Sequence, residues 1–265
     1  MAKKDLDLSF LKPNAEEFEL PSRGLSYDDK SALAKGKIHI RPWITSEEKI
    51  LDKFDRGNFF NVIKKLVQNA VVEKIDIDEM TDADVFFVLY WLRVITYGPT
   101  YKIDRECPEC GSKISVTVNI QDYPIKYLEE YKDEFELELP VSKIKLKMKF
   151  PKFGSLIEAT ESKHSDLYKM GIKMSPEIYR YALCTEEMTL PTETKDILTK
   201  ADDFNLMLNK IWPMLPAGDL VEIKQYLAKF DHGYTENATS QCPECQKFFN
   251  QAPIMTDEFF RPSGR

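Results

Sequence analysis

Two identical tetrapeptides, Cys107-Pro108-Glu109-Cys110 and Cys242-Pro243-Glu244-Cys245, constrain the fold more than any other feature of the sequence. They lie in opposite halves of the chain and contain four of its five cysteines. A Cys-x-x-Cys turn directs two thiolates at one point, and two such turns complete a tetrahedron around a divalent ion, for which zinc is the expected metal. Four protein ligands leave no open position for a substrate, so we expect one structural zinc ion.

The long separation of the two pairs is unusual, because ordinary zinc ribbons keep their pairs within ~20 residues. A zinc ion bound by all four cysteines would therefore tie two distant regions of the chain together. Gly111 can adopt the positive φ that a tight knuckle needs, whereas Gln246 stands at the corresponding place in the second knuckle. Two disulfides, zinc shared between subunits and a coincidental repeat remain open as other interpretations.

The composition is that of a folded globular protein, since 265 residues with 43% hydrophobic and 12% aromatic content suffice for a buried core. No stretch approaches the ~20 apolar residues of a membrane helix. Residues 1–10 lack the apolar core of a signal peptide, so we expect the chain in a reducing cytoplasm, which favours zinc over disulfides. The net charge is −7 and its charges are interspersed, so nucleic acid is not an expected partner.

Apolar periodicity and helix boundary signals predict an α+β protein with a mainly helical body and a small β zinc-ribbon region formed by the two distant knuckles. A capping motif at residues 45–48 opens one helix that runs to about Gly57. Further helices are predicted near residues 59–70, 81–97, 155–170, 176–187, 202–211 and 217–230. Within the helix predicted at residues 81–97, Arg93 is expected to keep its charged head in water.

Alternating residues predict the strands. Residues 36–42 form one, and residues 113–120 leave the first knuckle as another, with residues 101–104 as the expected partner. In residues 142–150 a row of lysines at every second position (Lys143, Lys145, Lys147 and Lys149) is expected to be a solvated strand face, although it also invites a functional interpretation.

The domain organisation predicted from these elements is an N-terminal arm, residues 1–19, followed by a single compact domain, residues 20–265. Sub-lobes are expected at residues 20–100, which are helical, at residues 101–150 together with 240–255, which hold the zinc ribbon and β structure, and at residues 151–235, which are helical.

No catalytic constellation is present in the sequence. It has no phosphate-binding loop, dinucleotide fingerprint or Ser-His-Asp arrangement, and only three histidines. The fifth cysteine, Cys184, lacks the neighbouring motif of an activated nucleophile, and buried free cysteines are common. We therefore expect a protein that is not an enzyme.

Several motifs together resemble a known family. They are Leu20-Pro21-Ser22-Arg23-Gly24 followed by Tyr27, Arg41-Pro42, Glu47-Glu48, Arg93 with Tyr97-Gly98, the two cysteine pairs and Phe259-Phe260-Arg261-Pro262. Over most of residues 20–262 the chain resembles the baseplate hub protein family of contractile-tailed, T-even-type bacteriophages, the gene 26 product family. The zinc assignment rests on the cysteines and not on this resemblance.

The resemblance implies a role in the tail baseplate, as a hub component of the virion or as a chaperone-like assembly factor in the host cytoplasm. The implied partners are other baseplate hub or tail proteins, and both roles remain open. A zinc-ribbon protein associated with nucleic acid or transcription is the alternative function.

Two irregular segments are predicted to contact partners, because each combines apolar anchors with an arginine, the composition enriched at interface cores. The predicted contact residues are Leu20, Pro21, Arg23 and Tyr27 in the first segment and Phe259, Phe260 and Arg261 in the second. Packing of both segments on the protein's own core is the other interpretation.

Overall fold

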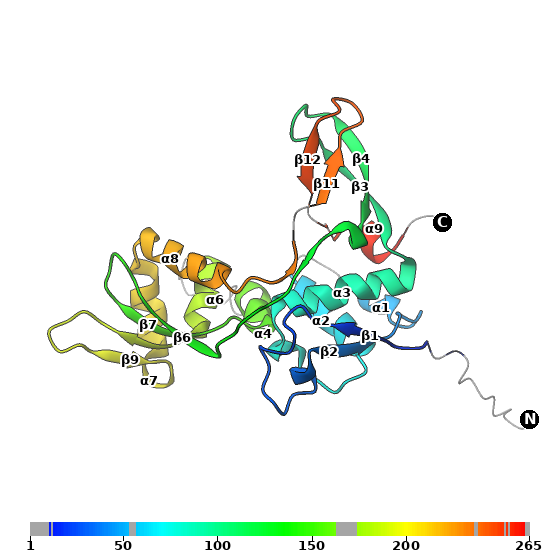
Figure 1. Ribbon diagram of the computed structural model, residues 1–265. Helices are drawn as coiled ribbons and strands as arrows, with labels where there is room; N and C mark the ends of the chain where they lie inside the picture. Colours follow the sequence, from blue (N-terminus) through cyan, green and yellow to red (C-terminus); the bar gives the residue numbers. More distant parts are fainter. Residues whose placement is uncertain are drawn as a thin grey trace, which may run out of the picture.

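The computed structural model describes residues 11, 13–52, 57–162, 174–235, 238–251, 253 and 255–262. The buried apolar side chains form two clusters, and each cluster is the core of one lobe. Figure 1 shows the two lobes side by side, with a pair of β-hairpins standing out from the first. None of the described helices combines the length and apolarity that crossing a membrane requires.

The first lobe is built around helix α3 (Asp82–Tyr97), which packs against helix α2 (Phe59–Ala70). The apolar residues of α2 recur three and four positions apart, and this face is buried. Around these helices lie α1 (Glu48–Leu51), α4 (Phe153–Ile157), α9 (Asp257–Phe260), the 3-10 helices η2 (Ala32–Lys35), η3 (Ile77–Glu79) and η4 (Ile120–Asp122), and two antiparallel pairs, β1 (Glu16–Glu19) with β2 (Lys37–Ile40) and β5 (Ile125–Lys126) with β10 (Gly233–Tyr234).

The second lobe packs helices against an antiparallel four-stranded sheet of order β6-β7-β8-β9. Its strands are β6 (Glu134–Glu138), β7 (Lys145–Lys149), β8 (Thr185–Thr189) and β9 (Ile197–Thr199). Its helices are α6 (Pro176–Cys184), α7 (Lys200–Leu206) and α8 (Ala217–Ala228), with the π-helices η5 (Glu158–Ser162) and η6 (Met207–Ile211) and the 3-10 helix η7 (Trp212–Met214). Strands β6 and β7 thus share a core with α6 and α8, whereas the domain prediction grouped them with the zinc ribbon.

The prediction of a mainly helical body is wrong, because the chain is a mixed α/β fold with about 39% helix, 23% strand and several small sheets. The helix predicted for residues 176–187 ends at Cys184, and β8 follows at once. Strand β8 pairs with both β7 and β9, and this pairing outweighs the helical pattern of the residues before it. The helices predicted at 45–57 and 155–170 are described only in part, because residues 53–56 and 163–173 lie outside the described chain.

The end of α3 shows a second difference from expectation. Arg93 is 1% exposed and donates hydrogen bonds to the carbonyl oxygens of Gly98, at 2.5 Å, and Thr100, at 3.1 Å. Its guanidinium also lies over the rings of Tyr97 and Tyr101. Arg93 is therefore a buried connection between α3 and the strand that follows it, not a side chain with its head in water.

Polar contacts join the lobes. Arg180 on α6 forms a bidentate ion pair with Asp82 at the start of α3, with distances of 2.6 and 2.8 Å. Lys152, which directly precedes α4, donates to the carbonyl oxygen of Ser26 at 2.7 Å. Its ammonium lies near the ring of Tyr27 in the first lobe and near that of Tyr131, which packs against the second core. Bidentate arginine–carboxylate contacts fix orientation as well as distance, so these contacts hold the two lobes in one arrangement.

Candidate metal centre

Each cysteine pair forms the turn of a β-hairpin. The first joins β3 (Thr100–Glu106) to β4 (Lys113–Asn119), and the second joins β11 (Ala238–Gln241) to β12 (Phe248–Gln251). The predicted pairing of residues 113–120 with residues 101–104 is confirmed, since β3 and β4 are paired along their whole length. Both hairpins stand together at the end of the first lobe, with their knuckles at the tip (Figure 1).

The backbone of the two knuckles follows the same pattern. In each, the amide after the second cysteine donates at 2.9 Å to the carbonyl oxygen of the first cysteine. Gly111 and Gln246 occupy this position, with φ values of 72° and 62°. A Cβ at Gly111 would meet no neighbouring atom, so this position of a knuckle has room for a side chain. Gln246 has a side chain at the corresponding position, and its backbone is in the less favourable left-handed conformation.

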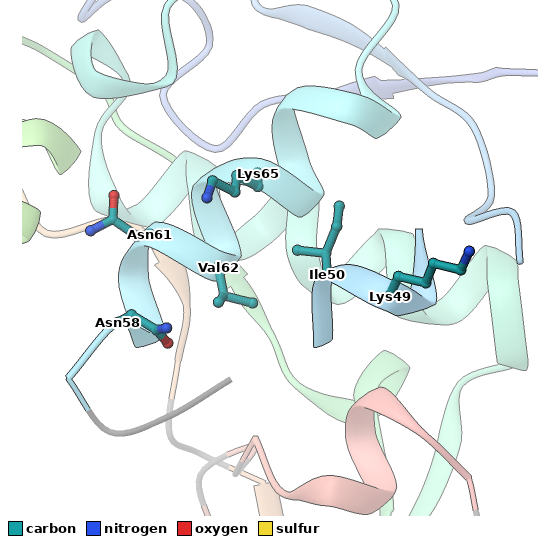
Figure 2. Close-up of a pocket in the computed structure, with 6 residues that line it drawn as sticks. All are labelled: Lys49, Ile50, Asn58, Asn61, Val62 and Lys65. Carbon is teal, nitrogen blue, oxygen red and sulfur yellow. The ribbon is translucent and has the colours of Figure 1, made fainter. Parts of the chain in front are cut away.

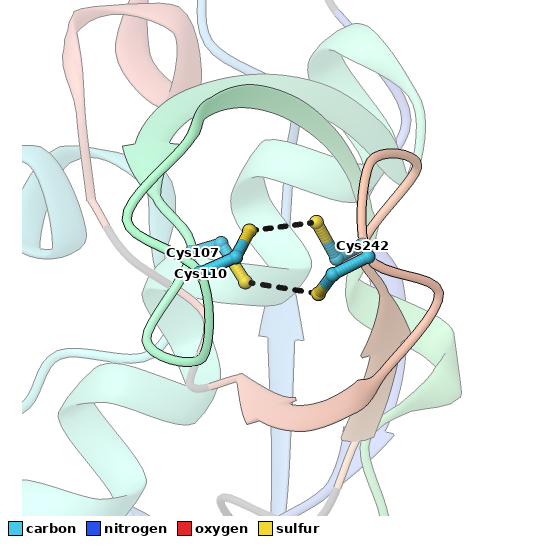
Figure 3. Close-up of side chains that lie close together, drawn as sticks. Cys107, Cys110 and Cys242 are labelled. Carbon is cyan, nitrogen blue, oxygen red and sulfur yellow. Dashed lines mark hydrogen bonds between the residues drawn. The ribbon is translucent and has the colours of Figure 1, made fainter.

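The four sulfur atoms converge on one point between the hairpins (Figure 3). Cys107 lies 3.9 Å from Cys245 and Cys110 lies 3.9 Å from Cys242, measured between Sγ atoms, and all four sulfurs lie within 4.8 Å of one another. A tetrahedral ion with metal–sulfur bonds of ~2.3 Å has sulfurs ~3.8 Å apart, so the spacing fits such an ion. The four cysteines are unbridged and can hold a metal ion.

The electrostatics of the cluster also favour a bound cation. Hydrogen bonds from the side chain and backbone of Ser112 lower the pKa of Cys110 to about 6. The amide of Lys247 lowers the pKa of Cys245, but desolvation and the neighbouring cysteines together raise it to about 12. Sulfurs this close together do not all ionise unless a cation compensates their charge, and a bound divalent ion supplies that compensation.

Side-chain contacts between the hairpins support the cluster from outside. Arg105 on β3 lies over the ring of Phe249 on β12, at 4.8 Å from the centroid. Lys247 in the second knuckle forms an ion pair with Glu109 in the first, at 3.1 Å. No sequence signal marks these residues as partners, because their proximity depends on how two distant hairpins pack.

The first predicted docking segment forms a turn against α3. Leu20 is fully buried, Pro21 is also buried, and Tyr27 donates to the carboxylate of Asp84 at 2.6 Å. That carboxylate is fully buried and also accepts the amide of Ser22, at 3.0 Å. The side chain of Arg23 is half exposed, at 50%.

The second predicted docking segment is α9 and its flank. Phe259 is fully buried and packs edge-on against Tyr90 and Tyr101, and Phe260, 6% exposed, stacks with Trp43. Arg261 is 48% exposed and pairs with Asp52 at 2.5 Å. The aromatic residues therefore belong to the first lobe's core, while the docking role of both segments stays a prediction.

The row of lysines on β7 is neutralised by its neighbours in the sheet. Lys147 pairs with Glu134 at 3.0 Å, Lys149 with Glu186 at 3.6 Å and Lys145 with Glu138 at 3.7 Å. The glutamates come from β6 and β8, on both sides of β7. Lys143 lies in the preceding turn with a positive φ of 61°. The row is thus a solvated sheet face of alternating charge, as expected.

Cys184 lies apart from the metal centre, in the core of the second lobe, where it is 6% exposed. Burial raises its pKa to about 11. A thiol with a raised pKa is a poor nucleophile at neutral pH, which agrees with the structural interpretation of this residue.

A family model described as T4 bacteriophage base plate protein matches residues 24–260. No curated protein and no solved structure matches the chain significantly. The family match includes both lobes and both cysteine knuckles, so it applies to the whole fold. It confirms the resemblance to phage baseplate proteins found in the sequence.

Proposed function

Since the chain belongs to the family of T4 bacteriophage base plate proteins, we propose that it is a non-enzymatic hub component of the tail baseplate or a factor that assembles the hub. The family match along residues 24–260 is the observation that carries this proposal. Membership implies a place in the virion tail and association with other tail proteins. As an assembly factor, the protein would act in the host cytoplasm while the tail is built.

A single structural zinc ion, bound by Cys107, Cys110, Cys242 and Cys245 of one chain, is the second part of the proposal. It is supported by the convergence of the four sulfurs at tetrahedral spacing. Zinc binding contributes on the order of 10 kcal/mol in small zinc peptides, far more than the contacts between the hairpins contribute. The ion would therefore hold the C-terminal hairpin on the N-terminal half of the chain.

The third part of the proposal is that the two predicted segments contact other hub or tail proteins. The buried members of the predicted segments, such as Leu20 and Phe259, would hold their backbones rigid, and the exposed members would meet hub or tail proteins. Arg23 and Arg261 have half-exposed guanidinium groups, and Leu25 between the anchors is 46% exposed. A rigid segment loses little conformational entropy on binding, which favours association.

Mass spectrometry of purified phage particles and of infected-cell lysate tests the function. A hub component is expected in the particles, in proportion to the other baseplate proteins. An assembly factor is expected in lysate complexes with hub or tail proteins and not in the particles. A chain found in neither the particles nor such complexes would reject the proposal.

A further inference from the structure

A hollow of about 360 Å³ lies on the first lobe, between α1 and the start of α2, apart from the metal centre and from the first predicted docking segment (Figure 2). Arg261 of the second predicted docking segment donates to the carbonyl oxygen of Glu48 at 2.9 Å, so that segment contacts the helix that lines the hollow. It is lined by Lys49 and Ile50 on α1, by Asn58 just before α2, and by Asn61, Val62 and Lys65 on α2.

The hollow has an apolar floor and a basic rim. Ile50 is half-buried and Val62 is 4% exposed, and Figure 2 shows Ile50 on α1 and Val62 on α2. Lys49 and Lys65 are exposed at its edge, and two asparagine side chains add amide groups. An apolar floor with polar groups at the rim is the usual form of a protein-binding surface.

Lys49 and Lys65 form the basic rim of the hollow. Neither Lys49 nor Lys65 forms an ion pair with any residue that the structure describes, whereas the adjacent Lys64 pairs with Asp78. Asn58 and Asn61 lie at the N-terminal end of α2, whose first turn contains no acidic residue, so the positive end of the helix dipole also borders the hollow. In a chain of net charge −7, this is a local positive site beside apolar surface.

We propose that this hollow docks an acidic, amphipathic segment of another tail protein. Carboxylates of the segment would meet Lys49 and Lys65, and an apolar side chain between them would cover Ile50 and Val62. The inference rests on the proposed function, in that a baseplate protein associates with other tail proteins. A nucleic-acid backbone fits less well, because phosphate binding needs a concentrated basic surface and would leave the apolar floor uncovered.

Fluorescence anisotropy with the zinc-loaded full chain tests the proposal, and the probe is a fluorescein-labelled peptide of alternating aspartate and leucine. The double variant Lys49→Glu/Lys65→Glu should raise the Kd for this peptide by about tenfold or more, since it reverses both rim charges. The matched control is Lys126→Glu/Lys132→Glu, which makes the same charge change at two exposed lysines outside the hollow. The control should change the Kd by less than about twofold, because distant exposed charges are screened.

Equal weakening by the two double variants would show that only net charge matters and would overturn the proposal. No binding of the acidic peptide, or no effect of the rim variant, would overturn it as well. A peptide of alternating lysine and leucine should bind more weakly than the acidic probe, and stronger binding of the basic peptide contradicts the assigned charge. These measurements use purified protein, so their failure is distinct from absence of the chain from tails.

Discussion

Four sulfur atoms from the two halves of the chain converge in one cluster, so the zinc proposal can be tested by replacing single residues. Replacing Cys242, which is fully buried in the cluster, by Ser removes one ligand from the site. We expect the zinc content to fall from about one ion per chain to well below that, and the free energy of unfolding to fall by several kcal/mol. Elemental analysis and urea denaturation measure the two effects.

The control for this variant is Cys184→Ala, which alters a buried cysteine outside the cluster. It should retain the metal while losing at most the packing energy of one small side chain. A wild-type chain that stays fully folded without metal in the presence of a chelator would contradict the zinc assignment.

The ion pair between Arg41 and Glu47 predicts a pH dependence of stability. Burial raises the pKa of Glu47, but hydrogen bonds from Arg41 and the amide of Ile44 outweigh burial and lower it below 4.5. The stabilisation is therefore present above about pH 4.5 and is lost as the pH falls through the lowered pKa. Glu47→Gln should cost about 1–2 kcal/mol at pH 7 and flatten this acid-side loss, as measured by denaturation between pH 3 and 7. An unchanged pH profile in Glu47→Gln would show that other carboxyl groups cause the loss.

At the scale of elements, α9 has only four residues, yet it places two aromatic side chains in the core. Phe259→Ala should reduce the free energy of unfolding by about 3–5 kcal/mol, because it leaves a cavity between Tyr90 and Tyr101. Arg261→Ala, which removes an exposed ion pair, should change it by less than about 1 kcal/mol. Thermal melts of the two variants make the comparison, and equal losses would show that α9 does not stabilise the lobe through Phe259.

Elements whose signals are local were predictable from the sequence. The cysteine pairs and the alternating residues 113–119 are local patterns, and they predicted the cluster of four cysteines and the β3–β4 hairpin. Burial of Leu20 and Phe259 was not predictable, because irregular segments have no period that separates a core face from a solvent face. Strand β8 was missed for a related reason, since its conformation depends on pairing with β7 and β9.

On the scale of the whole molecule, three kinds of connection hold distant parts of the chain together. The candidate metal centre joins the two hairpins, α9 anchors the C-terminal segment to the first lobe, and the Arg180–Asp82 ion pair joins the lobes. The first lies at the projecting hairpins, the second is in the core of the first lobe, and the third lies between the lobes. Loss of the metal should therefore destabilise the two hairpins and leave the core of the second lobe intact.

Hydrogen exchange with and without a zinc chelator tests this division. On chelation, amides of β11 and β12 should lose protection first, because these short strands pair only with each other among the described residues. The amides of β6, β7 and β8 should keep theirs, since that sheet packs in the separate core of the second lobe. The wild-type chain with excess zinc is the control. Uniform loss of protection across both lobes would mean that the chain unfolds as one cooperative unit, and unchanged protection in the hairpins would mean that no metal holds them.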